Sequence, residues 1–354
     1  MAGSALEQVA PADGELAGRL RKSMAAVEAR LRDAAADSPD PLIVQAAGYL
    51  LDAGGKRWRP LLVLLGAEFG DPETAEVSDA AVAVELIHAA SLHHDDVMDD
   101  APLRHGVPSA QIRWNNKIAI LVGDHLFARG ATVSLELGEA ARRAQAHAFE
   151  RLVRGQVREV AGPRRGEDPV EHHLEVVRDK SASLIALAVR LGGMCAGADA
   201  AAVRALGEYG EALGVAFQLS DDIIDIVSEA DRAGKAPGAD LRAGVPTLPV
   251  LLALREAGDG SGDAAGHAAG DAAGAGEDAA AGRLREILGA GAVVDDGPHA
   301  EALRLLRASP VLELARAEVA RYAGEARAAA RRLPERAARD VLESLCDLVT
   351  GRSA

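Results

Sequence analysis

Residues 78–100 read SDAAVAVELIHAASLHHDDVMDD. The first part of this stretch is apolar around most of a helical circumference, which is typical of a helix at the centre of a helical bundle. The stretch ends in two aspartate pairs, at residues 95–96 and 99–100. Four residues turn an α-helix by about 400°, so Asp95 and Asp99 lie one turn apart on the same face. The stretch therefore predicts a buried helix that ends in converging carboxylates.

A second stretch has the same arrangement. Residues 213–225 read LGVAFQLSDDIID, so that Asp225 follows Asp221 by four residues at the end of another apolar run. Carboxylates at this spacing repel one another, and holding them beside an apolar face costs further free energy. A hard divalent cation offsets both costs, and oxygen ligands of this kind suit Mg²⁺, which shares phosphate oxygens with a substrate. One such cluster alone reads equally well as a solvated helix end, but two matching clusters favour a metal site.

The rest of the chain has the same helical periodicity. Apolar residues recur at three- and four-residue steps, and the sequence lacks alternating strand patterns closed by hairpin turns. We therefore expect an all-α fold, a large single-domain helical bundle with a central cleft between two Asp-rich helices. Residues 1–14 are expected to form a disordered N-terminus and residues 15–354 the domain. Residues 258–282, GDGSGDAAGHAAGDAAGAGEDAAAG, hold almost no large apolar side chain and are expected to form a flexible insertion.

Composition limits the classes of function. The chain has 354 residues, a net charge of −15 and 26% charged residues, which fits neither a disordered protein nor the basic footprint of a nucleic-acid-binding one. No window reaches the roughly 18 unbroken apolar residues of a membrane span, and the N-terminus lacks the pattern of a secretion signal. Two cysteines are too few for a disulfide framework. We expect a cytoplasmic protein without a nucleic-acid partner.

Basic residues flank both acidic clusters. They are grouped in GGKRWRP at residues 54–60, in Arg104-His105-Gly106, in Lys180-Ser181 and at Lys235. Any one of these cations alone could be a solvated charge that contributes little. As a set, they predict a cleft in which two metal-binding walls and a ring of cations hold two diphosphate groups.

Taken in order along the chain, these segments resemble the trans-isoprenyl diphosphate synthase (polyprenyl synthetase) family. The matching segments are GGKRWRP, HAASLHHDDVMDDAPLRHG, LVGDHL, DKSASLI, AFQLSDDIIDI, GKAPGADLRAG and TLP, and the resemblance runs from about residue 15 to the end. It implies an all-α fold of the isoprenoid synthase type and a homodimer. It also implies a Mg²⁺-dependent transferase that condenses isopentenyl diphosphate head-to-tail (1'-4) with an allylic diphosphate.

The resemblance assigns roles motif by motif. Three Mg²⁺ ions per active site would be held, with substrate bound, by Asp95, Asp96, Asp99, Asp221, Asp222 and Asp225. The catalytic residues that it implies are Asp95, Asp96, Asp99, Arg104, Lys180, Gln218, Asp221, Asp222 and Lys235. Of these, Arg104, Lys180 and Lys235 would contact the allylic diphosphate, and Gln218, with Ser181, would lie near the developing allylic cation. Isopentenyl diphosphate would be bound by Lys56, Arg59, His88 and His105.

Three positions depart from the family pattern. Where the family usually has a second arginine, this chain has His105, and where it often has a threonine and a lysine, this chain has Ser181 and Val245. Because a histidine loses its proton above about pH 6.5, we expect His105 to bind isopentenyl diphosphate more weakly than an arginine does. One contact to the allylic diphosphate is expected to be missing at Val245. These changes bear on rate and affinity rather than on the class of reaction.

The product length is predicted from the helix before the first cluster, along which the growing chain is expected to run. Ala90 and Ser91, five and four residues before Asp95, are small, and Ile87, further back, is medium-sized. Because each helical turn is about 5.4 Å long, such a tunnel is open for several isoprene units. The sequence therefore predicts a medium-to-long product, C30 or longer rather than C15. Phe127 could still form a floor, and the small residues could equally serve only helix packing.

Other functions remain open beside this interpretation. A geranylgeranyl or farnesyl diphosphate synthase would differ in product length alone. A class I terpene cyclase also uses Asp-rich helices and Mg²⁺, but it needs aromatic faces for migrating cations, and the chain has only four Phe, two Trp and three Tyr. A non-catalytic subunit of a heteromeric synthase should have lost aspartates, and both clusters are intact.

Overall fold

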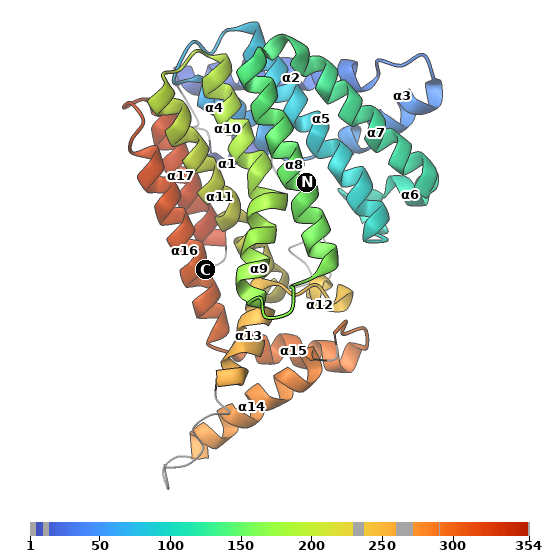
Figure 1. Cartoon of the computed structure of the whole chain (residues 1–354), viewed down its shortest axis with the longest axis vertical. Helices are drawn as coiled ribbons and strands as arrows, with labels where there is room; N and C mark the ends of the chain where they lie inside the picture. Colours follow the sequence, from blue (N-terminus) through green and yellow to red (C-terminus); the bar gives the residue numbers. More distant parts are fainter. Residues whose placement is uncertain (1–4, 10–13, 229–236, 260–271, 290, 353–354) are drawn as a thin grey trace. The chain divides into compact units, whose positions relative to one another are not determined.

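The computed structural model describes residues 5–9, 14–228, 237–259, 272–289 and 291–352 (Figure 1). Over these residues the elements are helices, apart from one hairpin of two short strands, β1 (Leu103–Arg104) and β2 (Val107–Pro108). The prediction of an all-α fold is confirmed. The helices are α1 (Ala5–Val9), α2 (Glu15–Ala35), α3 (Pro41–Asp52), α4 (Trp58–Ala67), α5 (Ala75–Met98), α6 (Ala110–Arg113), α7 (Asn116–Val133), η1 (Ser134–Leu137), α8 (Glu139–Ala161), α9 (Pro169–Val176), η2 (Val177–Ala182), α10 (Ser183–Cys195), α11 (Ala200–Val227), α12 (Ala239–Ala243), α13 (Leu248–Asp259), α14 (Ala272–Leu288), α15 (Asp296–Ala308), α16 (Val311–Ala330) and α17 (Ala337–Arg352).

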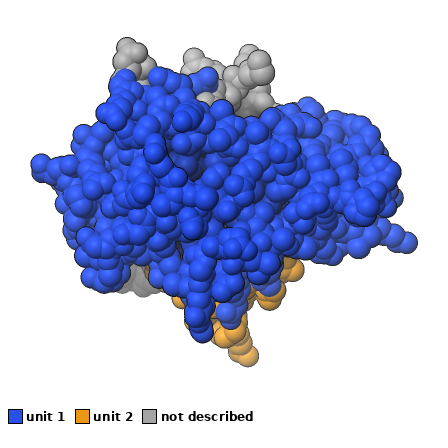
Figure 2. Space-filling model, turned by 90° about the horizontal axis from the view of Figure 1, so that it is seen from above, with its two compact units in different colours: residues 1–153, 180–214, 325–346 blue, residues 154–179, 215–324, 347–354 orange. Residues whose placement is uncertain are grey.

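The chain divides into two compact units, which Figure 2 shows in blue and orange. The expectation of one domain over residues 15–354 stays a prediction. Unit 1 comprises residues 1–153, 180–214 and 325–346, and unit 2 comprises residues 154–179, 215–324 and 347–354.

The core of unit 1 is built around α5, which packs against α2, α4, α7 and α10. Beside it, α4 and α10 approach backbone to backbone. A Cβ atom on Gly66 would lie 2.1 Å from the carbonyl oxygen of Val189, and one on Gly192 would lie 1.9 Å from that of Val63. Any side chain at either glycine would push the two helices apart, so both positions require glycine. This contact fixes α4, and with it the GGKRWRP segment that leads into α4.

Helix α5 ends at the first of the two aspartate clusters, residues 95–100. The N–H of Asp99 donates to the carbonyl oxygen of Asp95 at 2.8 Å and closes the last turn. Asp100 then has a positive φ of 47°, and Pro102 cannot continue a helix. The acidic cluster is therefore held at the C-terminal end of a long buried helix.

The β1–β2 hairpin follows directly. Its two-residue loop consists of His105 and Gly106, both with positive φ (52° and 81°), as a type I′ turn requires. The N–H of Ser109 donates to the carbonyl oxygen of Pro102 at 3.1 Å and closes the hairpin at its base. The hairpin therefore keeps Arg104 and His105 close to the end of α5.

Residues 169–195 have one continuous helical pattern in the sequence, but the structure divides it. Helix α9 begins after Asp168, whose side chain caps it by accepting the N–H groups of Val170 and Glu171. A π-helical turn, η2, then separates α9 from α10. Such turns are frequent at functional sites, and this one contains Lys180 and Ser181.

Two segments that we expected to be flexible are partly helical. Within residues 1–14, residues 5–9 form α1, and the N–H of Ala5 donates to the carbonyl oxygen of Lys56 at 2.9 Å. Within residues 258–282, α13 continues to Asp259 and α14 begins at Ala272. The remaining parts of both segments that lie outside the described residues are 1–4, 10–13 and 260–271.

One stretch, Asn116–Leu137 (α7 and η1), is long and apolar enough to cross a membrane by length and composition, with a mean hydropathy of 1.3. One such helix is weak evidence, because core helices of soluble proteins have the same composition. Only 33% of it is buried, and Ile120 and Leu121 are 41% and 61% exposed. The absence of a membrane span stays a prediction, and α7 presents an apolar outer face.

Candidate active site

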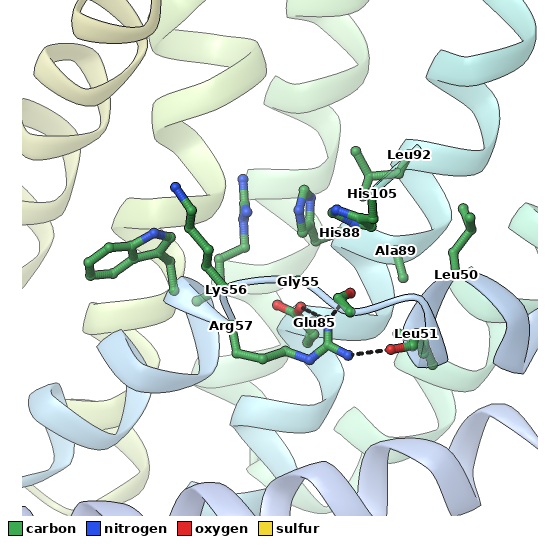
Figure 3. Close-up of a pocket in the computed structure, with 13 residues that line it drawn as sticks. Leu50, Leu51, Gly55, Lys56, Arg57, Glu85, His88, Ala89, Leu92 and His105 are labelled. Carbon is green, nitrogen blue, oxygen red and sulfur yellow. Dashed lines mark hydrogen bonds and ion pairs between the residues drawn. The ribbon is translucent and has the colours of Figure 1, made fainter. Parts of the chain in front are cut away.

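Unit 1 contains a pocket in which three of the predicted motifs meet (Figure 3). The GGKRWRP segment supplies Lys56 and Arg59, α5 supplies His88, and the hairpin supplies His105. These are the four residues that the resemblance assigns to isopentenyl diphosphate, so the structure brings that whole set together. The pocket is lined by Leu50, Leu51, Gly54, Gly55, Lys56, Arg57, Trp58, Arg59, Glu85, His88, Ala89, Leu92 and His105.

The loop before α4 explains why the motif begins with two glycines. Gly54 and Gly55 have φ values of 115° and 138°, which side chains rarely allow. A Cβ atom on Gly55 would also lie 2.5 Å from Nη1 of Arg57. Figure 3 shows Lys56 and Arg57 pointing to opposite sides of this loop. The glycines therefore let Arg57 fold back beneath the loop while Lys56 points the other way.

Burial sets the charges in the pocket. Arg59 Nε is buried and has no hydrogen-bond partner among the described residues. Burial lowers the pKa of Arg59, and the carboxylate of Glu85 opposes this shift. Burial also holds the pKa of His88 well below its usual range, and the positive charge of Arg59 adds to the effect. The pocket thus combines a neutral histidine with a buried cation whose unsatisfied N–H suits an anionic ligand.

The first aspartate cluster contains three carboxylates in different surroundings. Asp96 is fully buried, and its Oδ1 accepts hydrogen bonds from Nε and Nη2 of Arg104 at 2.8 and 2.5 Å. Asp95 and Asp99 share a face next to that of Asp96, and Asp95 is half-buried while Asp99 is exposed. The C-terminal end of a helix already carries partial negative charge, so additional carboxylates there favour cations. Arg104 supplies one cation at Asp96, and the face with Asp95 and Asp99 suits a second.

In unit 2, the buried carboxylate of Asp222 is held by the protein. Its Oδ1 accepts a hydrogen bond from Nε2 of Gln218 at 3.3 Å. Its Oδ2 lies 3.1 Å from Nε2 of His173 and 3.4 Å from the backbone nitrogen of Leu248. Gln218 therefore helps to orient the carboxylate of Asp222.

The other two aspartates of the second cluster differ. Both carboxylate oxygens of Asp225 accept backbone N–H groups, those of Ala239 and Asp240, each at 3.1 Å, so that Asp225 holds the start of α12. Asp221 is only half-buried and pairs with Nη2 of Arg352 at 2.8 Å. Asp221 is therefore held by an arginine side chain, whereas Asp225 is held by backbone N–H groups.

The donor atoms fit a hard divalent cation, because every candidate ligand is a carboxylate oxygen. Among the described residues, no three such side chains already converge on one position. Asp96, Asp222 and Asp225 are engaged by Arg104, by side chains and by backbone groups. Asp99 is exposed, and Asp95, Asp221 and Asp225 are half-buried.

The remaining predicted residues are placed as follows. Lys180 and Ser181 lie half-buried in η2. Lys235 lies outside the described residues. Ala90 is fully buried and Ile87 is 4% exposed, and the hydroxyl of Ser91 donates to the carbonyl oxygen of His88 at 2.8 Å.

The chain-length residues lie where α5 packs against α7. A Cβ atom on Gly130 of α7 would lie 3.2 Å from Cγ1 of Ile87, and one on Gly123 would lie 3.3 Å from the carbonyl oxygen of Ala90. Phe127 lies between these two glycines in sequence and contacts the rings of His94 and Phe149, with centroids 5.4 and 4.7 Å apart. The predicted tunnel and its possible floor therefore lie on the same two helices.

Sequence reasoning missed Glu85 and underestimated Arg57. Both line the pocket, and they contact one another at 3.4 Å. A signal for Glu85 was present, because it is the only charged residue in the apolar run AAVAVELIHAASL, residues 80–92. A carboxylate inside such a run needs a buried partner, and Arg57 could have been considered for that role.

Comparisons with known proteins concern the chain as a whole rather than this site. The model of the protein family described as polyprenyl synthetase matches residues 40–278 of the chain. The chain is 43% identical over 341 residues to a nonaprenyl diphosphate synthase of Mycobacterium tuberculosis, covering 96% of this chain and 95% of the relative.

Two solved structures have the same fold. One is a geranylgeranyl pyrophosphate synthase from Corynebacterium glutamicum in complex with calcium and isoprenyl diphosphate (40% identity, TM-score 0.81, 97% of this chain and 99% of that chain). The other is a polyprenyl synthase from Caulobacter crescentus with the same ligands (32% identity, TM-score 0.82, 96% of this chain and 97% of that chain). With the helical fold, the GGKRWRP pocket and both aspartate clusters in place, the chain belongs to the polyprenyl synthetase family and is a prenyltransferase.

Proposed function

We propose that this enzyme condenses isopentenyl diphosphate head-to-tail (1'-4) with an allylic diphosphate and makes an all-trans polyprenyl diphosphate of medium to long chain. The observation that carries the proposal is the pocket that Lys56, Arg59, His88 and His105 line together, in which Nε of Arg59 is buried without a hydrogen-bond partner among the described residues. The relative named nonaprenyl diphosphate synthase supports a product of C30 or longer.

In this proposal, the two diphosphates are bound by different groups. Lys56 and Arg59 hold isopentenyl diphosphate, and neutral His88 contributes a hydrogen bond. Arg104, Lys180 and Lys235 contact the allylic diphosphate, with Asp95, Asp99 and Asp221 as the carboxylates that hold Mg²⁺. Bound Mg²⁺ would act as a Lewis acid that stabilises the negative charge on the departing diphosphate.

The chain's own residues then orient the carbon–carbon step. As the allylic C–O bond breaks, the electron pair leaves with the diphosphate, and the double bond of isopentenyl diphosphate attacks the allylic carbon. The proton that is lost afterwards passes to the released diphosphate, so no protein base is required. Ser181 and Gln218 are proposed to lie near the allylic cation, and the buried apolar faces of α5 exclude water from it.

The enzyme is also proposed to be a homodimer. The exposed apolar face of α7, with Ile120 and Leu121, supports an interface between two copies. The number of Mg²⁺ ions, the cytoplasmic location and the lack of a nucleic-acid partner stay predictions from the sequence.

A geranylgeranyl diphosphate synthase is the second candidate. It is favoured by the 40% identical structure of that name from Corynebacterium glutamicum. The two candidates differ in product length only, so one assay separates them.

The test is a product assay. Purified enzyme is incubated with Mg²⁺, labelled isopentenyl diphosphate and, separately, C5, C10, C15 and C20 allylic primers, and the dephosphorylated products are sized. A ladder that ends at C30 or beyond is expected. A ladder that ends at C20 would favour the second candidate, a cyclic hydrocarbon would indicate a cyclase, and no elongation of any primer would contradict both synthase proposals.

A further inference from the structure

Arg57 lines the pocket, yet its guanidinium is fully engaged by the protein (Figure 3). Its Nε and Nη2 bind the two carboxylate oxygens of Glu28 on α2 at 2.9 and 3.2 Å, and its Nη1 lies 3.4 Å from Oε1 of Glu85 on α5. The side chain is only 10% exposed. Two backbone carbonyls accept its remaining bonds, those of Leu51 (2.8 Å) and Gly54 (3.1 Å). Arg57 is therefore a poor candidate for direct contact with a ligand.

Glu85 lines the same pocket as two arginines, Arg57 and Arg59. Its side chain is 6% exposed, its Oε1 contacts Arg57, and its Oε2 has no hydrogen-bond partner among the described residues. Burial raises the pKa of Glu85, and the positive charges of Arg57 and Arg59 oppose this shift. Burial lowers the pKa of Arg59 and the negative charge of Glu85 opposes this shift, but Glu85 contacts Arg57 and not Arg59.

We propose that Arg57 is a positioning residue: by binding Glu85, it keeps this carboxylate from pairing with Arg59 and leaves Arg59 and Lys56 available to the diphosphate of isopentenyl diphosphate. The inference rests on the proposed function for the identity of that ligand. A buried carboxylate without a cation is costly, so Glu85 without Arg57 would recruit the neighbouring arginine. Arg59 would then be paired before the substrate arrives, and binding would have to break that pair.

Glu28 does not share this role. It is bound by Arg57 but also by Nη2 of Arg32 at 2.9 Å, and its side chain is 26% exposed. When Arg57 is replaced, Glu28 keeps both a cation and water. Glu85 is therefore the acid that determines the effect.

The test is a double-variant cycle with Arg57→Gln and Glu85→Gln. Arg57→Gln is expected to raise KM for isopentenyl diphosphate by about tenfold or more, the loss typical of one charge-assisted hydrogen bond, with kcat and KM for the allylic primer close to wild type. Arg57→Gln/Glu85→Gln is expected to recover most of this loss, because the competing carboxylate is gone. A merely structural role for Arg57 would instead lower the melting temperature of Arg57→Gln, which Glu85→Gln would restore, and would leave KM for isopentenyl diphosphate unchanged in every variant.

Arg30→Gln is the matched control. Arg30 on α2 pairs with buried Asp79 on α5, which is also a contact between an arginine and a buried carboxylate of α5, but neither residue lines the pocket. This variant is expected to lower the melting temperature without changing KM for isopentenyl diphosphate. An unchanged KM in Arg57→Gln, or a double variant as impaired as the single one, would overturn the inference.

A binding measurement separates this inference from the proposed function. The wild type and the three pocket variants are titrated with inorganic diphosphate by calorimetry in the absence of Mg²⁺. Arg57→Gln is expected to bind inorganic diphosphate more weakly than the wild type, and the double variant is expected to recover most of this affinity. If the wild type elongates no primer but this order holds, the proposed function fails and the role of Arg57 stands. If the wild type elongates primers and Arg57→Gln binds diphosphate as tightly as wild type, only the role of Arg57 fails.

Discussion

His105 meets two requirements at once. Its backbone has a φ of 52° in a two-residue turn, a conformation in which histidine is enriched over most other side chains. Its side chain lines the pocket at the place where the family usually has an arginine. Histidine therefore suits the turn better than arginine does, while it offers the diphosphate a weaker cation.

His105→Arg is expected to lower KM for isopentenyl diphosphate several-fold at pH 8, because a permanent charge replaces an imidazole. Arginine in the left-handed conformation should at the same time cost about 0.5–1 kcal/mol of stability. Steady-state kinetics and thermal unfolding measure the two effects. His147→Arg, at an exposed position on α8, is the control and should change neither. An unchanged KM would show that position 105 does not contact the substrate.

At the scale of single residues, the sequence predicted the four pocket-lining residues proposed to bind isopentenyl diphosphate, but not the residues that support them. Lys56 and Arg59 were predictable because GGKRWRP places cations next to glycines and proline, whereas His88 followed only from the family resemblance. The sequence could have predicted that Glu85 needs a buried cation, but its contact with Arg57 depends on a loop path in which Arg57 itself has a positive φ of 57°. No spacing of residues in the sequence indicates that a side chain folds back beneath its own loop.

Among the helices, α5 determines most of the site. It carries Glu85 and His88 for the pocket, Ala90 on the side of α7, and the first aspartate cluster at its end. Its existence followed from the long apolar run, and its observed bounds, Ala75–Met98, lie close to the stretch that predicted it. The π-helical turn at η2 was not predictable, because its residues fit a continuous helical pattern as well as their neighbours do.

Ala90→Phe is expected to shorten the product by several isoprene units, because an aromatic side chain at this buried position would close the predicted tunnel beside α7. Overpacking of this kind typically costs about 1–3 kcal/mol, so the assay is run well below the melting temperature of the variant. Product sizing is the measurement. Ala140→Phe, at an exposed position at the start of α8, should leave the product unchanged. An unaltered length in Ala90→Phe would contradict the tunnel assignment.

At the scale of the whole molecule, the outer face of α7 is one of the exposed apolar surfaces of the described residues. Leu121 is 61% exposed and Ile120 is 41% exposed on a helix that is only one-third buried. Apolar surface of this kind favours association, and a net charge of −15 disfavours it elsewhere on the surface. The proposed dimer is therefore expected to form through α7.

Leu121→Asp is expected to convert the dimer into a monomer, because it places a desolvated carboxylate in the interface. Sedimentation equilibrium measures the change. Leu135→Asp, at a position in η1 that is 57% exposed, tests whether the effect is confined to α7. A wild-type monomer, or a dimer that tolerates Leu121→Asp, would contradict this interface.

The pairing of Arg352 with Asp221 has a practical consequence. Arg352 lies in the last turn of α17, and its guanidinium also stacks on the ring of Phe217, 4.8 Å from the centroid. A substitution at residue 352, or a fusion that alters this turn of α17, would disturb a contact to an aspartate of the second cluster. Variants that differ only in this turn should differ in apparent metal affinity, so its integrity belongs among the controlled variables of every assay on this enzyme.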